Sequence, residues 1–235
     1  YLTTINKGDE VIIPAFTFLA TASMVFFAEG IPVFVDVDPE TFTIDVESVK
    51  ERISNKTKAI VPVHLFGNAA NIDSLREIAI DHDLFLIHDS AHAHGTLYNG
   101  NDVGSFDDLN CYSFYPSKTM TTGEGGMVTT NNEEFYKKGC LLRAHGDDGR
   151  YHHVMLGLNY RMMEIQSILG LDQLEKLDNF LKRRKECGKY LRENIKKIEG
   201  LSPQKIEDKA THSSSHFSLS INPEYYRCSR DDFVS

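Results

Sequence analysis

The alternation of short apolar runs with helix-like segments is the sequence feature that most constrains the fold. Six compact runs rich in Val and Ile are EVIIP, PVFVDV, KAIVPVH, LFLIHD, NCYSF and GMVTT. Runs of this kind are typical of strands buried on both faces of a parallel sheet. Helical segments are expected at Thr17–Ala28, Asp45–Ser54, Ile72–Asp83 and Glu133–Ala144, with Asp45 and Asn71 as N-caps. This order predicts an α/β fold with a mostly parallel central sheet flanked by helices.

From Met162 the pattern changes to a long helix, MMEIQSILGLDQLEKLDNFLKRRKE, whose apolar residues recur at helical spacing. It passes into the charged stretch KYLRENIKKIEG and then reaches a strand-like run, HFSLSI. We interpret the helix as the element that leaves the large domain. The prediction is a large α/β domain over 1–178, followed over 179–235 by the linking helix and the beginning of a smaller C-terminal domain.

Composition narrows the class of protein. The 41% apolar and 25% charged residues are ordinary for a soluble globular protein, and the net charge of -9 argues against general affinity for nucleic acid or anionic membranes. No apolar run has the length of a membrane span. The four cysteines contain no CxxC pair, which disfavours a zinc site or a disulfide framework. We predict a cytoplasmic protein without a metal.

Both ends of the chain look cut. The sequence enters its first strand within a few residues of Tyr1, and it stops at RDDFVS just after the strand-like run. We therefore expect a part of a longer protein, which lacks an N-terminal segment and the rest of the small domain.

Several polar residues lie where predicted strands end. LFLIHD finishes at Asp89, NCYSF carries Ser113, and Lys118 follows just past that strand. Phe18 stands near the start of the first helix. In open α/β sheets, ligands collect at the carboxyl ends of the strands. If these strands are neighbours, one crevice contains a carboxylate, a lysine, a hydroxyl, an aromatic ring and imidazoles.

This set matches the needs of pyridoxal 5'-phosphate. The cofactor takes a lysine for its Schiff base and a carboxylate opposite its pyridine nitrogen. That negative charge keeps the nitrogen protonated, so the ring acts as an electron sink. An aromatic side chain stacks on the ring, and hydroxyls with helix N-terminal N–H groups hold the phosphate.

Simpler interpretations stay open at this point. Lys118 could be a solvated charge, Asp89 could cap the turn after its strand, and Phe18 could belong to the core. The histidines of HDSAHAH could suggest a metal, but they lack a known ligand spacing, and such histidines are more often structural. GEGG could be only a tight turn. The residues alone favour an α/β enzyme with a lysine-centred site.

The amino-acid sequences of seven segments resemble those of a known family. In order along the chain they are GDEVIIPAFTFLATA, PVFVDVDPETFTID, KAIVPVHLFGNAANID, HDSAHAHG, CYSFYPSKTMTTGEGGMVTTN, LLRAHG and LGLNYRMMEIQSILGLDQLEKL. Together they closely resemble the DegT/DnrJ/EryC1/StrS aminotransferases, sugar aminotransferases among the fold-type I pyridoxal phosphate enzymes. The resemblance runs from about Gly8 to about Lys182.

The resemblance implies roles for matching positions. Lys118, in SFYPSK, is similar to the Schiff-base lysine, and Asp89, in HDSAH, to the aspartate that meets the pyridine nitrogen. His92 stands where the family has a Gln or His near the cofactor's 3'-oxygen. Phe18 resembles the aromatic that stacks on the ring, and Ser113 the serine that binds the phosphate.

Two further roles concern the partner subunit and the substrate. Asn159, in LNYRM, resembles an asparagine that reaches the phosphate of the neighbouring subunit, which implies a homodimer with shared active sites. Arg161 is a candidate for contacting substrate. The family's GT-x-AL helix start, which adds phosphate contacts, lies upstream of Tyr1 and is absent from this sequence.

The implied function is the transfer of an amino group from glutamate to the 3- or 4-keto group of a nucleotide-linked deoxysugar, for surface polysaccharide or glycoconjugate synthesis. A rival is a 3-dehydratase of the same family, but those enzymes have a histidine in place of the lysine. A cyclitol aminotransferase is a second alternative. A non-catalytic regulatory member is a third, against which Lys118 and Asp89 together argue.

Overall fold

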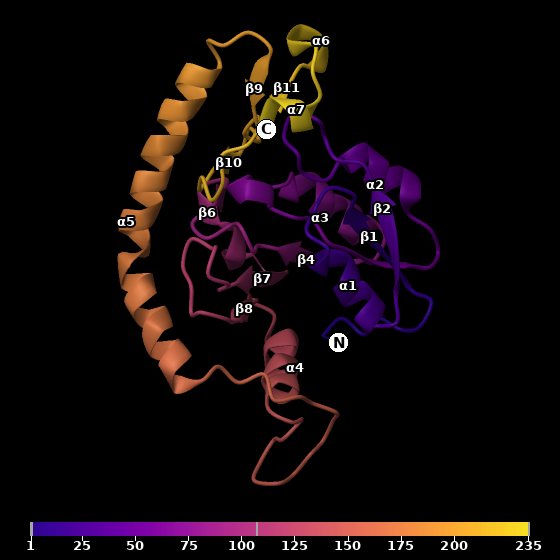
Figure 1. Ribbon diagram of the computed structural model, residues 1–235. Helices are drawn as coiled ribbons and strands as arrows, with labels where there is room; N and C mark the ends of the chain where they lie inside the picture. Colours follow the sequence, from indigo (N-terminus) through magenta and orange to yellow (C-terminus); the bar gives the residue numbers. More distant parts are fainter. Residues whose placement is uncertain (1, 107, 235) are drawn as a thin grey trace.

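The computed structural model describes residues 2–106 and 108–234, and a six-stranded sheet forms its centre (Figure 1). The strand order is β2-β1-β3-β4-β7-β8. Five strands are parallel, and β8 is antiparallel to β7. The strands are β1 (Glu10–Pro14), β2 (Ile31–Val35), β3 (Thr57–Ile60), β4 (Phe85–Asp89), β7 (Leu109–Ser113) and β8 (Gly126–Thr129). Each predicted apolar run forms one of these strands, so the mostly parallel sheet is confirmed.

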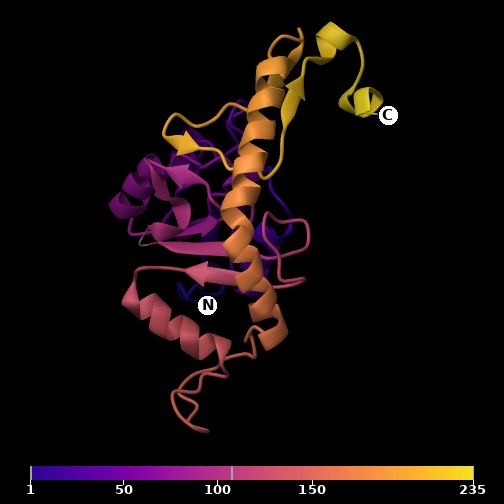
Figure 2. The same cartoon turned by 90° about the vertical axis from the view of Figure 1, so that its left-hand side faces the viewer.

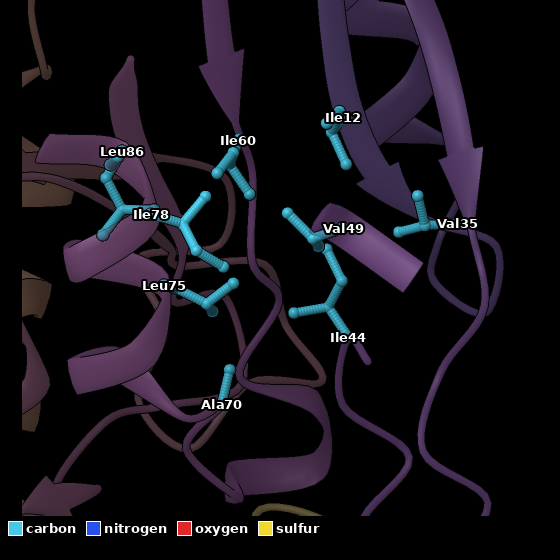
Figure 3. Packing of buried hydrophobic residues seen from close by; sticks show 10 residues of the cluster. Ile12, Val35, Ile44, Val49, Ile60, Ala70, Leu75, Ile78 and Leu86 are labelled. Atoms are coloured by element: carbon cyan, nitrogen blue, oxygen red, sulfur yellow. The ribbon is translucent and has the colours of Figure 1, made fainter. Parts of the chain in front are cut away.

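Helices cover both faces of the sheet. Ile12 and Ile60 pack on the side of α2 (Val46–Arg52) and α3 (Ile72–Asp81), in the cluster of Figure 3. Val11 and Ile13, which alternate with Ile12 along β1, pack on the opposite side against α1 (Ala20–Phe27). Successive side chains of a strand point to opposite faces, so a run of consecutive apolar residues is needed where both faces are covered.

The predicted caps fix the starts of α2 and α3. The side chain of Asp45 accepts a hydrogen bond from the Ser48 N–H at 2.9 Å, and that of Asn71 accepts one from the Ser74 N–H at 3.2 Å. Each bond satisfies one of the N–H groups that the first helical turn leaves without a partner. The helix predicted from Thr17 begins later, at Ala20.

Two helices follow the sheet, α4 (Glu133–Arg143) and α5 (Glu164–Ile195). Residues 144–163 between them extend beyond the end of α4, away from the sheet (Figures 1 and 2). α5 is one unbroken helix of 32 residues that runs along one side of the preceding elements. The predicted domain boundary after residue 178 falls inside it, and the division into domains stays a prediction.

After α5 the chain folds back onto elements that precede α5. β10 (Ala210–Thr211) pairs with β5 (Leu97–Tyr98), which also pairs with β6 (Asn101–Asp102). β9 (Leu201–Pro203) pairs with β11 (Leu219–Ile221), the only part of HFSLSI that forms a strand in the described chain. The remaining short elements are η1 (Leu65–Gly67), η2 (Val103–Ser105), α6 (Pro223–Tyr226) and α7 (Arg230–Val234). Within the described ranges, no helix is long and apolar enough to cross a membrane.

Candidate active site

The ends of β4 and β7 bring Asp89 and Lys118 close together. The two strands are parallel neighbours, with Asp89 opposite Cys111. β7 ends at Ser113, and the following turn is closed by the Lys118 N–H, which donates to the Tyr115 carbonyl at 3.0 Å. Partial burial lowers the pKa of Lys118, and the nearby charge of Asp89 opposes that shift. The sheet therefore places an amine and a carboxylate in one electrostatic environment.

Both carboxylate oxygens of Asp89 are held. Oδ1 accepts from the Ala91 N–H at 3.1 Å, so the side chain does cap the turn after β4. Oδ2 accepts from the Thr21 hydroxyl of α1 at 3.0 Å. The described residues include no ion pair between Asp89 and Lys118, although their charges interact. The carboxylate of Asp89 is thus fixed, and the amine of Lys118 lies close enough for the two charges to interact without an ion pair.

His92 is a neutral imidazole beside this pair. Its Nδ1 accepts from the Phe66 N–H at 3.3 Å, which assigns the ring proton to Nε2. Phe66 also stacks on the ring, with 5.9 Å between centroids. Burial, followed by the positive charge of Lys118, lowers the pKa of His92 to about 4. At neutral pH, His92 can donate a hydrogen bond from Nε2 without carrying charge.

The other two histidines of HDSAHAH are buried, and the positive charge of Lys118 also lowers the pKa of His94. His88 is fully buried, with its Nδ1 3.1 Å from His64 Nε2 and its Nε2 3.4 Å from Asp108. His94 packs between Tyr112 and Phe114, and no hydrogen bond reaches either of its ring nitrogens in the described part of the chain. No group of three His, Cys, Asp or Glu side chains in that part is arranged to hold a metal ion.

Phe18 and Ser113 are placed near the same edge of the sheet. Phe18 is 77% exposed, which rules out the core interpretation. It precedes α1, and its carbonyl accepts from the N–H of Thr21, the residue that holds Asp89, at 3.2 Å. The Ser113 hydroxyl accepts from the Tyr115 N–H at 3.3 Å, so its own hydrogen is available to an anion.

Asn159 and Arg161 lie apart from this cluster. Both are exposed in the segment 144–163, where Arg161 Nε donates to Asn159 Oδ1 at 3.0 Å. Asn159 does not cap α5, because the N-cap is Met163, whose N–H is bonded by Gln166 at 3.0 Å. In the described part of this chain, no hydrogen bond or ion pair connects either residue with Lys118.

Two residues of this region were not predicted from the sequence. Thr21 holds Asp89, and the only signal for it was its position one turn after Phe18. His216 comes from the segment before β11, and its ring lies 4.6 Å from that of His92 between centroids. No periodicity or spacing connects HSSSH with the ends of β4 and β7, so sequence reasoning had no means of placing His216 there.

These residues fit pyridoxal phosphate. The amine and the carboxylate are held near each other without forming an ion pair, as a flat ring that takes the amine at one end and the carboxylate at the other requires. Phe18 is exposed three residues before Thr21, which holds Asp89, and His92 and Ser113 offer neutral donors. A cation-binding site would need convergent oxygen or nitrogen ligands instead.

Solved structures share this architecture. The aminotransferase from Psychrobacter cryohalolentis matches 99% of this chain with a TM-score of 0.93 at 34% sequence identity, and the match covers 65% of that protein. The fold is therefore that of the fold-type I pyridoxal phosphate transferases.

The family follows from sequence. The model of the DegT/DnrJ/EryC1/StrS aminotransferase family matches residues 2–235, and the chain belongs to this family. It is 40% identical to GDP-perosamine synthase of Escherichia coli O157:H7 over 83% of this chain and 54% of that protein. It is 38% identical to UDP-N-acetyl-3-dehydro-α-D-glucosamine 3-aminotransferase of Acidithiobacillus ferrooxidans, over 93% of this chain and 59% of that protein. The chain thus spans little more than half the length of these relatives.

Proposed function

We propose that the protein is a pyridoxal phosphate-dependent aminotransferase that moves an amino group from glutamate to a keto group of a nucleotide-linked deoxysugar. The observation that carries the proposal is the placement of Lys118 and Asp89 at neighbouring strand ends, close but without an ion pair. The names of the relatives, which refer to GDP- and UDP-linked sugars, support the substrate class. Surface polysaccharide or glycoconjugate synthesis is the process that such a product serves.

Five residues would hold the cofactor. Lys118 would attach it, Asp89 would meet its pyridine nitrogen, Phe18 would cover its ring, Ser113 would bind its phosphate, and His92 would donate to its 3'-oxygen. When bound, pyridoxal phosphate stabilises negative charge at the carbon next to the substrate nitrogen.

Lys118 would also move the proton. A general base works best when its pKa lies near the working pH, and burial lowers the pKa of the Lys118 amine toward that range. Asp89 would have the opposite effect on the pyridine nitrogen of the cofactor: a fixed carboxylate favours the protonated form of its partner, so it would raise the pKa of that nitrogen. Lys118 would therefore act as the base, and Asp89 would keep the ring nitrogen protonated.

The active sites are proposed to be shared in a cytoplasmic homodimer. Asn159 would bind the phosphate, and Arg161 the substrate, in the neighbouring subunit; both are exposed, and neither is bonded to Lys118 within the described part of their own chain. Large apolar side chains exposed on α1 and α5 support an interface: Met24, Phe26, Ile165, Ile168, Leu171 and Leu174. A closed two-fold interface creates two equivalent composite sites.

Lys118 also separates the proposal from its rivals. A 3-dehydratase of the family has histidine at this position, and a regulatory member needs neither Lys118 nor Asp89. A cyclitol acceptor differs only in the second substrate.

The test incubates the full-length protein, loaded with cofactor, with glutamate and a panel of GDP-, UDP- and dTDP-linked 3- and 4-keto sugars. Equal amounts of 2-oxoglutarate and amino sugar are expected. Loss of a sugar hydroxyl without 2-oxoglutarate would indicate the dehydratase, and no reaction with any sugar would contradict the proposal.

A further inference from the structure

The segment 204–217 after α5 is bound firmly to the large domain. Gln204 is buried, and its Nε2 donates to the Thr41 carbonyl at 2.7 Å. The Ser213 N–H donates to the Gly67 carbonyl at 3.0 Å, and the His216 N–H to the Phe66 carbonyl at 3.2 Å. Hydrogen bonds between buried groups are costly to lose because the freed polar groups have no water to replace them. The backbone at His216 is therefore fixed relative to η1.

The ring of His216 lies against the proposed active site. Its centroid is 4.6 Å from that of His92 and 5.7 Å from that of Phe66. The charge of Lys118 acts on His216 as it does on His92. Three elements that are distant in the sequence, η1, the turn after β4 and the segment before β11, thus meet at one point beside Lys118.

One ring nitrogen of His216 has no hydrogen bond within the described residues. Its Nδ1 lies 3.3 Å from the Ser215 hydroxyl, while no hydrogen bond within the ranges 2–106 and 108–234 involves its Nε2. The side chain is exposed, and it lines a cavity with Arg183 and Arg184. The ring is therefore accessible, and one of its nitrogens has no hydrogen bond within the described residues.

We infer that His216 is a substrate-contacting residue that hydrogen-bonds a hydroxyl or carbonyl oxygen of the sugar acceptor, and that it takes no part in binding the amino donor. This inference rests on the proposed function and deepens it, because it assigns one residue to one of the two half-reactions. The C-terminal segment would then contribute to acceptor specificity in addition to its packing.

The charges around His216 explain the assignment to the sugar. Partial burial of its ring, together with the positive charges of Lys118 and Arg184, lowers the pKa of His216 below its ordinary 6.5, so its imidazole is neutral at pH 7. A neutral imidazole suits an uncharged hydroxyl or carbonyl. The carboxylates of glutamate are bound better by a cationic side chain, since charge-assisted hydrogen bonds are about twice as strong as neutral ones.

The test separates the two half-reactions in the full-length protein. His216→Phe keeps an aromatic ring against His92 but removes the ring nitrogens, and His216→Gln keeps a hydrogen-bonding group. His82→Phe, at an exposed histidine that ends α3, is the matched control. Amination of the bound cofactor by glutamate is followed by its absorbance, and transfer to the keto sugar is followed in a second mixing step. Calorimetry with GDP-, UDP- and dTDP-linked 4-amino sugars, and with the bare nucleotides, gives a binding readout.

The inference predicts that His216→Phe slows transfer to the sugar and weakens amino-sugar binding, each about tenfold, the effect of one lost hydrogen bond. Glutamate-driven amination and binding of the bare nucleotide should change less than about twofold. His216→Gln should recover part of the loss, and His82→Phe should match the wild type. Equal losses in both half-reactions, or no loss in either, would overturn the inference while leaving the proposed function standing. If the wild type accepts no amino group from glutamate, the proposed function fails and the inference fails with it.

Discussion

At the scale of single residues, the orientation of the Asp89 carboxylate is set by its own hydrogen bonds. Its Oδ1 caps the turn through Ala91, and its Oδ2 is fixed by Thr21. These bonds set the direction of the carboxylate before any ligand arrives, so orienting it costs nothing at the moment of reaction. The turn-cap interpretation and the functional interpretation are compatible, because each carboxylate oxygen accepts one of these bonds and can accept a second.

Replacing Asp89 by Asn should affect the chemical step rather than binding. The amide keeps the shape but removes the charge that would favour protonation of the pyridine nitrogen. We expect kcat to fall about 100-fold, with KM within about threefold, as for an interaction made mainly in the transition state. Steady-state kinetics of the full-length protein measure both, with Asp81→Asn, at an exposed site on α3, as the control. An unchanged kcat would show that Asp89 is only a turn residue.

Helices and strands could be predicted where a short stretch of sequence carries the signal, as an apolar run or a cap residue does. Six apolar runs became the six strands of the main sheet, and Asp45 and Asn71 cap their helices as predicted. The contacts of His216 and Gln204 could not be predicted, because they depend on how the chain after α5 folds back. Two-residue strands such as β5 and β10 carry no periodicity from which to predict them.

Removing the Asp45 cap should weaken α2 and the sheet face that it covers. Asp45→Ala leaves the Ser48 N–H without its partner, and such substitutions typically cost about 1 kcal/mol. Urea unfolding measures the change in the free energy of unfolding. Glu47→Ala, in the first turn of the same helix, removes an exposed carboxylate and should cost less. Equal effects of the two variants would mean that the cap contributes no special stability.

At the scale of the whole molecule, buried neutral histidines make the fold sensitive to acid. Burial, with the charge of Arg192 as a second cause, lowers the pKa of His212 to about 4, and burial does the same for His94. Because the folded pKa is below the ordinary 6.5, the unfolded chain takes up protons first as the pH falls. The free energy of unfolding should therefore decrease from about pH 6.5 toward pH 4.

His212→Gln tests this linkage. The amide can still accept from the Ser214 N–H, which bonds His212 Nδ1 at 2.8 Å, but it does not titrate. Between pH 7.5 and pH 5, the variant should lose about 1 to 2 kcal/mol less stability than the wild type. Urea unfolding at both pH values measures this difference. Identical losses would show that His212 does not titrate on unfolding in this range.

Quaternary structure is tested by mixing two inactive variants. Lys118→Ala removes the amine, and Asn159→Asp sets a carboxylate against the phosphate of the neighbouring site. If the sites are shared, a mixed dimer keeps one intact site, so about a quarter of the wild-type activity should return once subunits exchange at random. Exchange is followed with tagged subunits. No recovery after proven exchange would place both residues in the same site.

The most direct measurement of the central claim is the chemical identity of the cofactor-bearing residue. Full-length protein is incubated with pyridoxal phosphate, reduced with borohydride, digested and analysed by mass spectrometry. The predicted result is the reduced pyridoxyl phosphate adduct on Lys118, together with loss of the visible absorption band. Lys118→Ala and Lys118→Arg should form no adduct there, since guanidinium is not a usable nucleophile near neutral pH. A stoichiometric adduct on another lysine, or an undiminished one in Lys118→Ala, would contradict the account.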